Sequence, residues 1–159
     1  MTDSSPPGTS TMEVPPRFGE TGIERIVVGF DASQSSARAS RLALVLATPR
    51  AGRIWFVHAS EVDGRIAEPL TEEEIDVPSR AVLRAMEALV SEAKSRGLQA
   101  LALIQEGPPG EVLLGVAREV DAGLIIAGTR GRGDPSRVLL GSVSAHIVAR
   151  APIPVMVVP

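Results

Sequence analysis

The stretch GTRGRGDPSRVLLGS at residues 128–142 is rich in glycine and arginine and contains a proline. This composition does not suit a regular helix or strand, so we expect a loop whose backbone approaches a ligand closely. Gly128 and Gly131 allow sharp turns and leave backbone N–H groups uncovered by side chains. Positive charge can come from the arginines of the stretch, Arg130, Arg132 and Arg137. Together these features predict a site for an anion.

A helix is expected to begin where this loop ends, at Gly141-Ser142. The first N–H groups of a helix have no acceptor inside the helix, and the helix dipole is positive at that end. Both properties favour the binding of a phosphate. The hydroxyl groups of Ser142 and Ser144 can add further donors.

Asp31 follows the apolar run RIVVGF at residues 25–30. A carboxylate accepts hydrogen bonds from hydroxyl groups, such as those of a ribose, and suits them better than it suits a phosphate. No candidate nucleophile accompanies Asp31, which makes a role as a general base the weaker interpretation. We therefore expect Asp31 to bind a sugar.

Apolar runs and amphipathic segments alternate from residue 25 onward. The apolar runs, expected as strands, are residues 25–30, 53–59, 98–104, 124–127 and 154–159. The periodic segments, expected as helices, begin near Ser35, span 78–96, lie within 107–123 and span 142–150. Strands that are apolar throughout indicate a sheet with both faces covered. The fold class is therefore α/β: an open, Rossmann-like, five-stranded parallel sheet with helices on both faces, in the order 3-2-1-4-5.

The spacing of apolar residues predicts which side of each helix is buried. In the first helix, Leu42, Val45 and Leu46 recur at helical spacing, and the second helix should end in a left-handed cap at Gly97. The apolar faces of the second and third helices consist of Val82, Met86, Leu89 and Ala93, and of Leu113, Val116, Ala117 and Val120.

In an open parallel sheet, ligands bind at the carboxyl ends of the strands, where successive crossovers go to opposite faces. For the order 3-2-1-4-5 this point lies between the first and the fourth strand. Asp31 follows the first strand and Gly128 begins the loop after the fourth, so the two should meet across one crevice. The loop matches neither GxxxxGKS/T nor GxGxxG, which disfavours a P-loop NTPase and a dinucleotide-binding domain.

The length of 159 residues fits a single domain, which we place at residues 23–159. Residues 1–22 are rich in proline and small polar residues, so a disordered tail is expected there. The net charge of −3 gives no case for nucleic acid as the main partner. There is no cysteine, and the apolar runs are far too short to cross a membrane, so we expect a cytoplasmic protein without a membrane partner.

Three segments resemble one known family. Gly128-x-x-Gly131, nine residues and then Gly141-Ser142 match the G-2x-G-9x-G-S/T signature of the ATP-binding branch of the universal stress proteins. RIVVGFDAS and WFVHAS are similar to the first two strands of that family, and LLGSVSAHIVARAPIPVMVVP is similar to its C-terminal block. The resemblance covers about residues 24–159.

The resemblance implies a regulatory, stress-response domain that binds ATP or a related adenine nucleotide, and Mg²⁺ can accompany the phosphates. The adenine and ribose would lie near Gly29, Asp31 and Ala59. The phosphates would lie on Ala127, Gly128, Arg130, Gly131, Gly141, Ser142, Val143 and Ser144.

The last apolar run, PVMVVP, forms an edge strand in the expected sheet. Four apolar residues on an open edge favour pairing with another chain, and two copies related by a two-fold axis would close that edge. The resemblance implies the same dimer. We therefore predict a homodimer through residues 154–158.

Two other functions stay open. A slow ATP hydrolase or phosphotransferase would need a residue that positions water, a catalytic lysine or an acid pair for Mg²⁺, and the sequence offers no obvious candidate, so we assign no catalytic residue. A dimeric interaction module that does not use nucleotide is the other alternative, against which the intact glycine signature argues.

The remaining residues of interest favour structural roles. We expect His58 to be a structural residue at a strand end, because no partner is evident to orient it as a base, and His146 and Trp55 to serve in packing. The acidic stretch at 68–76 suits a solvated flap better than a metal site, and the Arg-Gly-Asp at 132–134 is read as coincidence.

Overall fold

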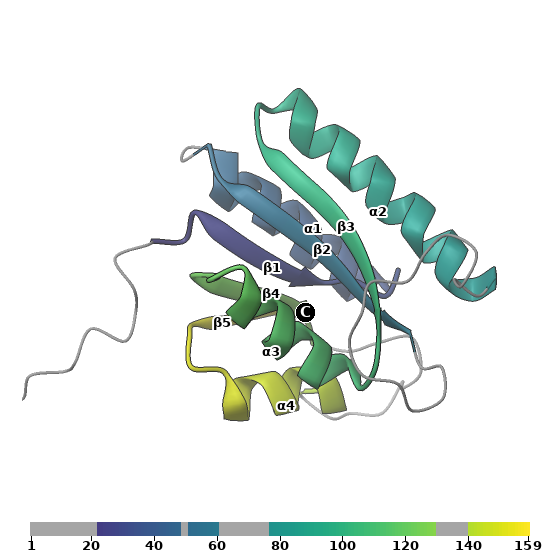
Figure 1. The fold of residues 1–159 in the computed structure, drawn as a ribbon, viewed down its shortest axis with the longest axis vertical. Helices are drawn as coiled ribbons and strands as arrows, with labels where there is room; N and C mark the ends of the chain where they lie inside the picture. The colour runs from purple at the N-terminus through teal and green to yellow at the C-terminus, as the bar shows by residue number, and fades with distance from the viewer. Residues whose placement is uncertain (1–21, 49–50, 61–76, 130–139) are drawn as a thin grey trace, which may run out of the picture.

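The computed structural model describes residues 22–48, 51–60, 77–129 and 140–159. Strands and helices alternate along this part of the chain, as the sequence predicts (Figure 1). The strands are β1 (Arg25–Gly29), β2 (Arg53–Ser60), β3 (Gln99–Glu106), β4 (Leu124–Gly128) and β5 (Val155–Val158). The helices are α1 (Gln34–Ala47), α2 (Val77–Ser95), α3 (Pro109–Glu119) and α4 (Ser142–Arg150). The acidic stretch at 68–76, the Arg-Gly-Asp at 132–134 and residues 1–21 of the expected tail lie outside the described residues.

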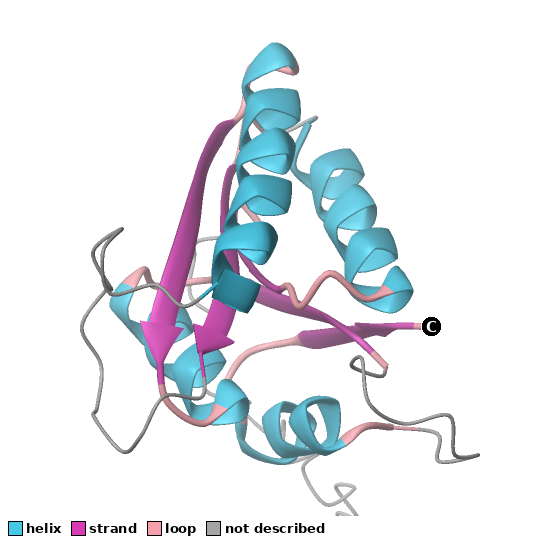
Figure 2. Cartoon of the chain, turned by 90° about the vertical axis from the view of Figure 1, so that its right-hand side faces the viewer, coloured by secondary structure: helices cyan, strands magenta, loops and turns pink. Residues whose placement is uncertain are grey.

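The strands form one parallel sheet in the order β3-β2-β1-β4-β5, which confirms the predicted order. Helices α1 and α2 cover one face of the sheet, and α3 and α4 cover the other (Figure 1, Figure 2). The crossover after β1 therefore runs over one face and the crossover after β3 over the opposite face. The carboxyl ends of β1 and β4 lie side by side where these two crossovers diverge.

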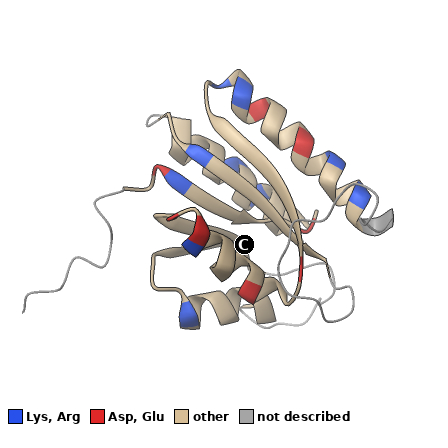
Figure 3. Cartoon of the chain, in the orientation of Figure 1, with Lys and Arg blue, Asp and Glu red and all other residues tan. Residues whose placement is uncertain are grey.

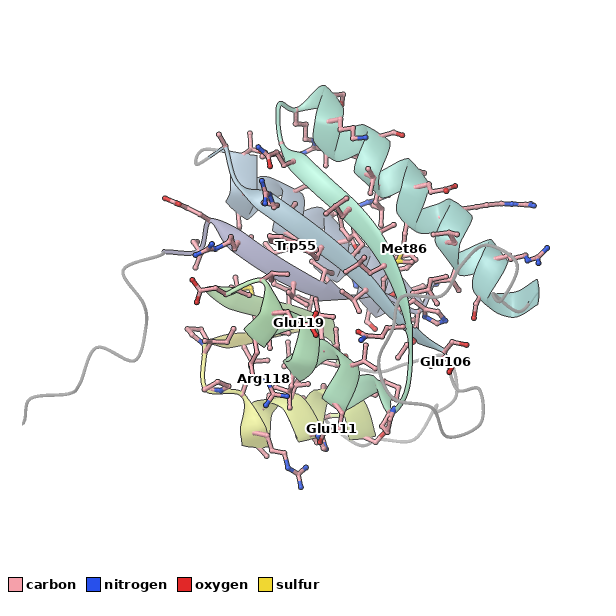
Figure 4. The ribbon with its side chains drawn as sticks, in the orientation of Figure 1. Trp55, Met86, Glu106, Glu111, Arg118 and Glu119 are labelled. Atoms are coloured by element: carbon pink, nitrogen blue, oxygen red, sulfur yellow. The ribbon has the colours of Figure 1, made fainter. Side chains whose placement is uncertain are left out.

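Each face of the sheet has its own hydrophobic core. Met86 of α2 is fully buried against one face, and Trp55 of β2 is 6% exposed on the other, where it packs with α3 (Figure 4). The packing role expected for Trp55 is confirmed, and the guanidinium of Arg53 lies 5.7 Å from the centre of its ring. Burial on both faces explains why the strands are apolar throughout.

The buried side of α1 differs from the prediction. Val45 is 59% exposed, although its spacing with Leu42 and Leu46 predicted a buried face. The helix packs on the sheet through Leu44 and several small residues, among them Ala39, Ala43 and Ala47, and all four of these are completely buried. Small side chains let the helix backbone approach the sheet closely, so Val45 does not mark the contact face here.

The other helices follow their predicted patterns. In α2, Val82, Met86 and Ala93 are buried, and Gly97 takes a left-handed φ of 75° just beyond the helix. The N–H of Leu98 donates to the Ala93 carbonyl at 3.0 Å, which closes the expected cap. Acidic and basic residues are interspersed along the length of α2 (Figure 3). Among the described residues, no helix is long and apolar enough to span a membrane.

Candidate functional site

A cavity of about 140 Å³ lies at the carboxyl ends of β1, β2 and β4. It occupies the predicted switch point of the sheet, and the start of α3 and the first turn of α4 close its sides. Its described lining is apolar except at a few positions, and comprises Gly29, Phe30, Asp31, Ser36, Val57, His58, Ala59, Pro109, Leu113, Ala127, Gly128 and Val143. Six of the predicted site residues are among them: Gly29, Asp31, Ala59, Ala127, Gly128 and Val143.

Small residues on the central strands keep this space open. A side chain at Gly29 would bring its Cβ to 3.0 Å from the Cδ1 of Leu113, and to 3.8 Å from the Cβ of Ala127. Because Leu113 comes from α3, the glycine lets that helix lie close over the end of β1. Pro109 and Leu113 were not among the predicted site residues, although the helical spacing placed Leu113 on a buried face.

Asp31 is fixed by a tight turn between β1 and α1. One carboxylate oxygen accepts a hydrogen bond from the N–H of Ser33 at 2.9 Å, and Ala32 between them has a left-handed φ of 62°. Such a φ in a residue with a Cβ costs about 1 kcal/mol or more. Ser33 in turn caps α1, since its Oγ accepts from the N–H of Ser36 at 3.2 Å. The turn holds the half-buried carboxylate at the wall of the cavity.

The structure gives Gly128 a steric role that the sequence did not reveal. A Cβ on this residue would lie 2.8 Å from the backbone nitrogen of Ser36, and closer still to the hydroxyl of Ser35. The end of β4 therefore touches the start of α1, and no side chain fits between them. Gly128 brings two segments together at the cavity in addition to starting the loop.

The first turn of α4 offers backbone donors to the cavity. Gly141 precedes the helix in an extended conformation, and as a glycine it provides no side-chain cap. The first helical hydrogen bond runs from the N–H of Ala145 to the Gly141 carbonyl at 2.9 Å, so the N–H groups of Ser142, Val143 and Ser144 have no acceptor within the helix. Val143 lines the cavity, which places this helix start beside the ends of β1 and β4.

The hydroxyl of Ser144 is already engaged, which differs from the expectation that it donates to a phosphate. Its one hydrogen is shared between the carbonyls of Thr129 and Gly141, which lie 3.1 and 3.0 Å from the Oγ, and the residue is 2% exposed. The N–H of Gly141 also donates to the Thr129 carbonyl. These bonds tie the start of α4 to the end of β4, so Ser144 can offer a ligand its N–H rather than its hydroxyl. Arg130 and Gly131 lie outside the described residues.

The two histidines have partners that the sequence did not show. Nδ1 of His58 lies 3.0 Å from the Phe30 carbonyl, which can only accept, so Nδ1 carries the proton. His58 also contributes to the cavity lining. His146 joins α4 to α3: its Nε2 lies 2.7 Å from a carboxylate oxygen of Glu111, and its ring occupies the space where Gly110 would carry a Cβ. The packing role expected for His146 is thus confirmed.

Known proteins share the sequence pattern and the fold of this chain. The model of the universal stress protein family matches residues 22–159. The chain belongs to the universal stress protein family. A universal stress protein of Thermus aquaticus is 35% identical over 138 residues, which cover 86% of this chain and 98% of that protein.

Some of the solved structures that are similar to this chain carry nucleotides. A universal stress protein in complex with cAMP is 27% identical, with a TM-score of 0.65, and the match covers 87% of this chain and 98% of that one. A universal stress protein of Archaeoglobus fulgidus in complex with dAMP is 25% identical, with a TM-score of 0.64, and the match covers 85% and 97%. Adenine nucleotides are thus ligands of proteins similar to this chain.

Proposed function

We propose that this universal stress protein binds ATP in the cavity at the ends of β1, β2 and β4, and that nucleotide occupancy regulates its conformation or its partners. The proposal depends chiefly on one observation: the same cavity adjoins a carboxylate, from Asp31, and the open N-terminus of α4, through Val143. A nucleotide can use both groups, because its sugar hydroxyls donate hydrogen bonds and its phosphate oxygens accept them. The related proteins that carry cAMP and dAMP support the adenine base.

The strand order suggests how the nucleotide lies. The phosphates would bind the N–H groups at the start of α4, together with Arg130 and Gly131 of the loop. The ribose would then lie at Asp31, after β1, and the base would lie beside Ala59, after β2. This path follows the carboxyl edge of the sheet in the order β4, β1, β2.

Mg²⁺ would be held chiefly by the nucleotide itself. Asp31 is a carboxylate in the described lining, and one of its oxygens already accepts from the N–H of Ser33. Mg²⁺ commonly keeps several waters and binds through phosphate oxygens with one or two carboxylates.

The proposal places the protein in the cytoplasm, where ATP is abundant.

A charge reversal at the phosphate end tests the proposal. Val143→Asp places a carboxylate in the first turn of α4, where it suits the helix dipole and so should leave the fold intact. Calorimetric titration should show ATP binding weakened by about tenfold or more, through repulsion of the phosphates, with little change for adenosine. The matched control is Val148→Asp, at a position that is 50% exposed on the same helix, which should bind ATP as the wild type does.

Two results would contradict the proposed site. Wild-type protein that gives no binding signal with millimolar ATP would remove nucleotide binding altogether. Equal ATP affinity in the wild type and the Val143→Asp variant would show that the phosphates do not bind at the start of α4.

We also propose that two copies pair through residues 154–158. β5 is the last strand of the sheet, and all four of its residues are apolar and only partly buried. Pairing across a two-fold axis would cover them and satisfy the backbone groups on the outer side of the strand.

A further inference from the structure

Gln105 of β3 is a largely buried polar residue that pairs with Ala59 of the cavity wall, although Gln105 itself is not among the lining residues. Its row on this face of the sheet runs Leu101, Leu103, Gln105, beside Trp55 and Val57 of β2. Leu101 is 51% exposed, whereas Gln105 is only 9% exposed. The apolar end of the row thus faces solvent and the polar end is covered, which is the reverse of what solvation alone would favour.

Gln105 and the cavity wall are in direct register. Gln105 pairs with Ala59 across β2 and β3, so their side chains project from the same face of the sheet, and adjacent strands lie about 4.8 Å apart. Ala59 lines the cavity. Glu106, the next residue, ends the strand (Figure 4), and the chain then turns through Gly107 into Pro109 at the cavity rim.

The Gln105 amide has no hydrogen-bond partner among the residues that the structure describes. In the same ranges, every side-chain nitrogen or oxygen that is sealed from solvent has a partner. The Gln105 amide must therefore reach an opening, although its residue is nine-tenths buried. Because the amide is open and bonds to no other described side chain, a ligand that supplies a donor and an acceptor can bind it without breaking a hydrogen bond within the described protein.

We propose that Gln105 recognises the edge of the adenine base and so sets the base specificity of the site. This inference rests on the proposed ATP site, in which the base lies beside Ala59. The primary amide presents an acceptor next to a donor, and adenine presents its exocyclic amine next to a ring nitrogen, so two hydrogen bonds can form side by side. The proposed nucleotide runs from β4 past β1 to β2, so its base lies at the end nearest β3, the strand that contains Gln105.

The test pairs a change in the protein with a change in the ligand. The variants are Gln105→Leu, which removes the amide at similar size, and Gln105→Met, which keeps the chain length. The control is Gln99→Leu, the same substitution on the same strand, at a residue that instead bonds to Arg53. Calorimetry would measure the binding of ATP and of purine riboside triphosphate, which lacks the exocyclic amine. Circular dichroism would check that each variant is folded.

We expect wild type and Gln99→Leu to bind ATP roughly fivefold to tenfold more tightly than purine riboside triphosphate, as one lost hydrogen bond implies. In Gln105→Leu and Gln105→Met the two ligands should bind with equal affinity. A preference for ATP that persists in a folded Gln105 variant would overturn the assignment of Gln105 while leaving the ATP site intact. Failure of wild type to bind either ligand would instead overturn the proposed function on which the inference rests.

Discussion

At the scale of single residues, the site depends on what glycine and aspartate do at strand ends. Gly29 and Gly128 bear no side chain at points where atoms of α3 and α1 lie directly against the sheet. Asp31 is held by its own turn, through the N–H of Ser33. The sequence identified all three residues as important, but for the ligand alone. Their steric and local roles could not be predicted, because the contact of Gly128 with Ser36 joins residues far apart in the chain.

Replacing Asp31 by asparagine removes the negative charge and should keep the turn between β1 and α1. Asparagine keeps an oxygen that can accept from the N–H of Ser33, so the cap of α1 should survive. A hydrogen bond from a ribose hydroxyl to a carboxylate is stronger than one to a neutral amide, so ATP affinity should fall by about tenfold. Calorimetric titration of the folded Asp31→Asn variant with ATP checks this. An unchanged ATP affinity would show that Asp31 does not bind the sugar.

Gly128→Ala should destabilise the fold itself. Its Cβ would press on the backbone of Ser36, which cannot move without shifting α1, so we expect a loss of about 2 kcal/mol in the free energy of unfolding. The control is Gly115→Ala in α3, where the added Cβ meets nothing within 4 Å, and which should stabilise the protein by about 0.5 kcal/mol. Urea denaturation measures both. Equal stability of the two variants would disprove the close contact between β4 and α1.

At the scale of elements, apolar runs and helix signals predicted the strands, the helices and the order of the sheet. They succeed because the central strands are buried on both faces and α2 ends at a local signal, Gly97. The predicted buried face of α1 was wrong at Val45, since the contact also depends on where small residues let the helix approach the sheet closely. The environment of Gln105 was equally hidden, because it follows from the register of β3 against β2.

The packing of α1 gives a prediction at this scale. Ala43→Val adds volume at a fully buried contact with the sheet and should lower the free energy of unfolding by about 2 kcal/mol. Val45→Ala, at a position that is 59% exposed, should change it by less than about 0.5 kcal/mol. Chemical denaturation of both variants decides the matter. A larger loss for Val45→Ala than for Ala43→Val would show that Val45 lies at the contact with the sheet.

At the scale of the whole molecule, the sheet has two edges with different characters. β3 is a long edge strand with Leu101 half exposed, and β5 is a short one made of four apolar residues. The carbonyls of Pro154 and Val158 accept from Ile125 and Thr129 on the β4 side. Since successive residues of a strand direct their backbone groups to alternate sides, the N–H of Val157 points to the outer edge.

Val157→Pro should therefore separate the proposed dimer while sparing the sheet. Proline removes the outward N–H without breaking the ladder between β4 and β5, and edge strands tolerate it. Sedimentation velocity at micromolar concentration should show a dimer for the wild type and a monomer for the variant. Leu101→Lys, on the opposite edge, should remain dimeric. A monomeric wild type, or a variant that stays dimeric, would refute pairing through β5.

The central claim is that one cavity holds the sugar at Asp31 and the phosphates at the start of α4. A crystal structure of the protein grown with ATP measures this most directly. We expect the phosphate oxygens within hydrogen-bond distance of the N–H groups of Val143 and Ser144, and a ribose hydroxyl on the Asp31 carboxylate. An empty cavity, or ATP bound elsewhere on the molecule, would contradict the account.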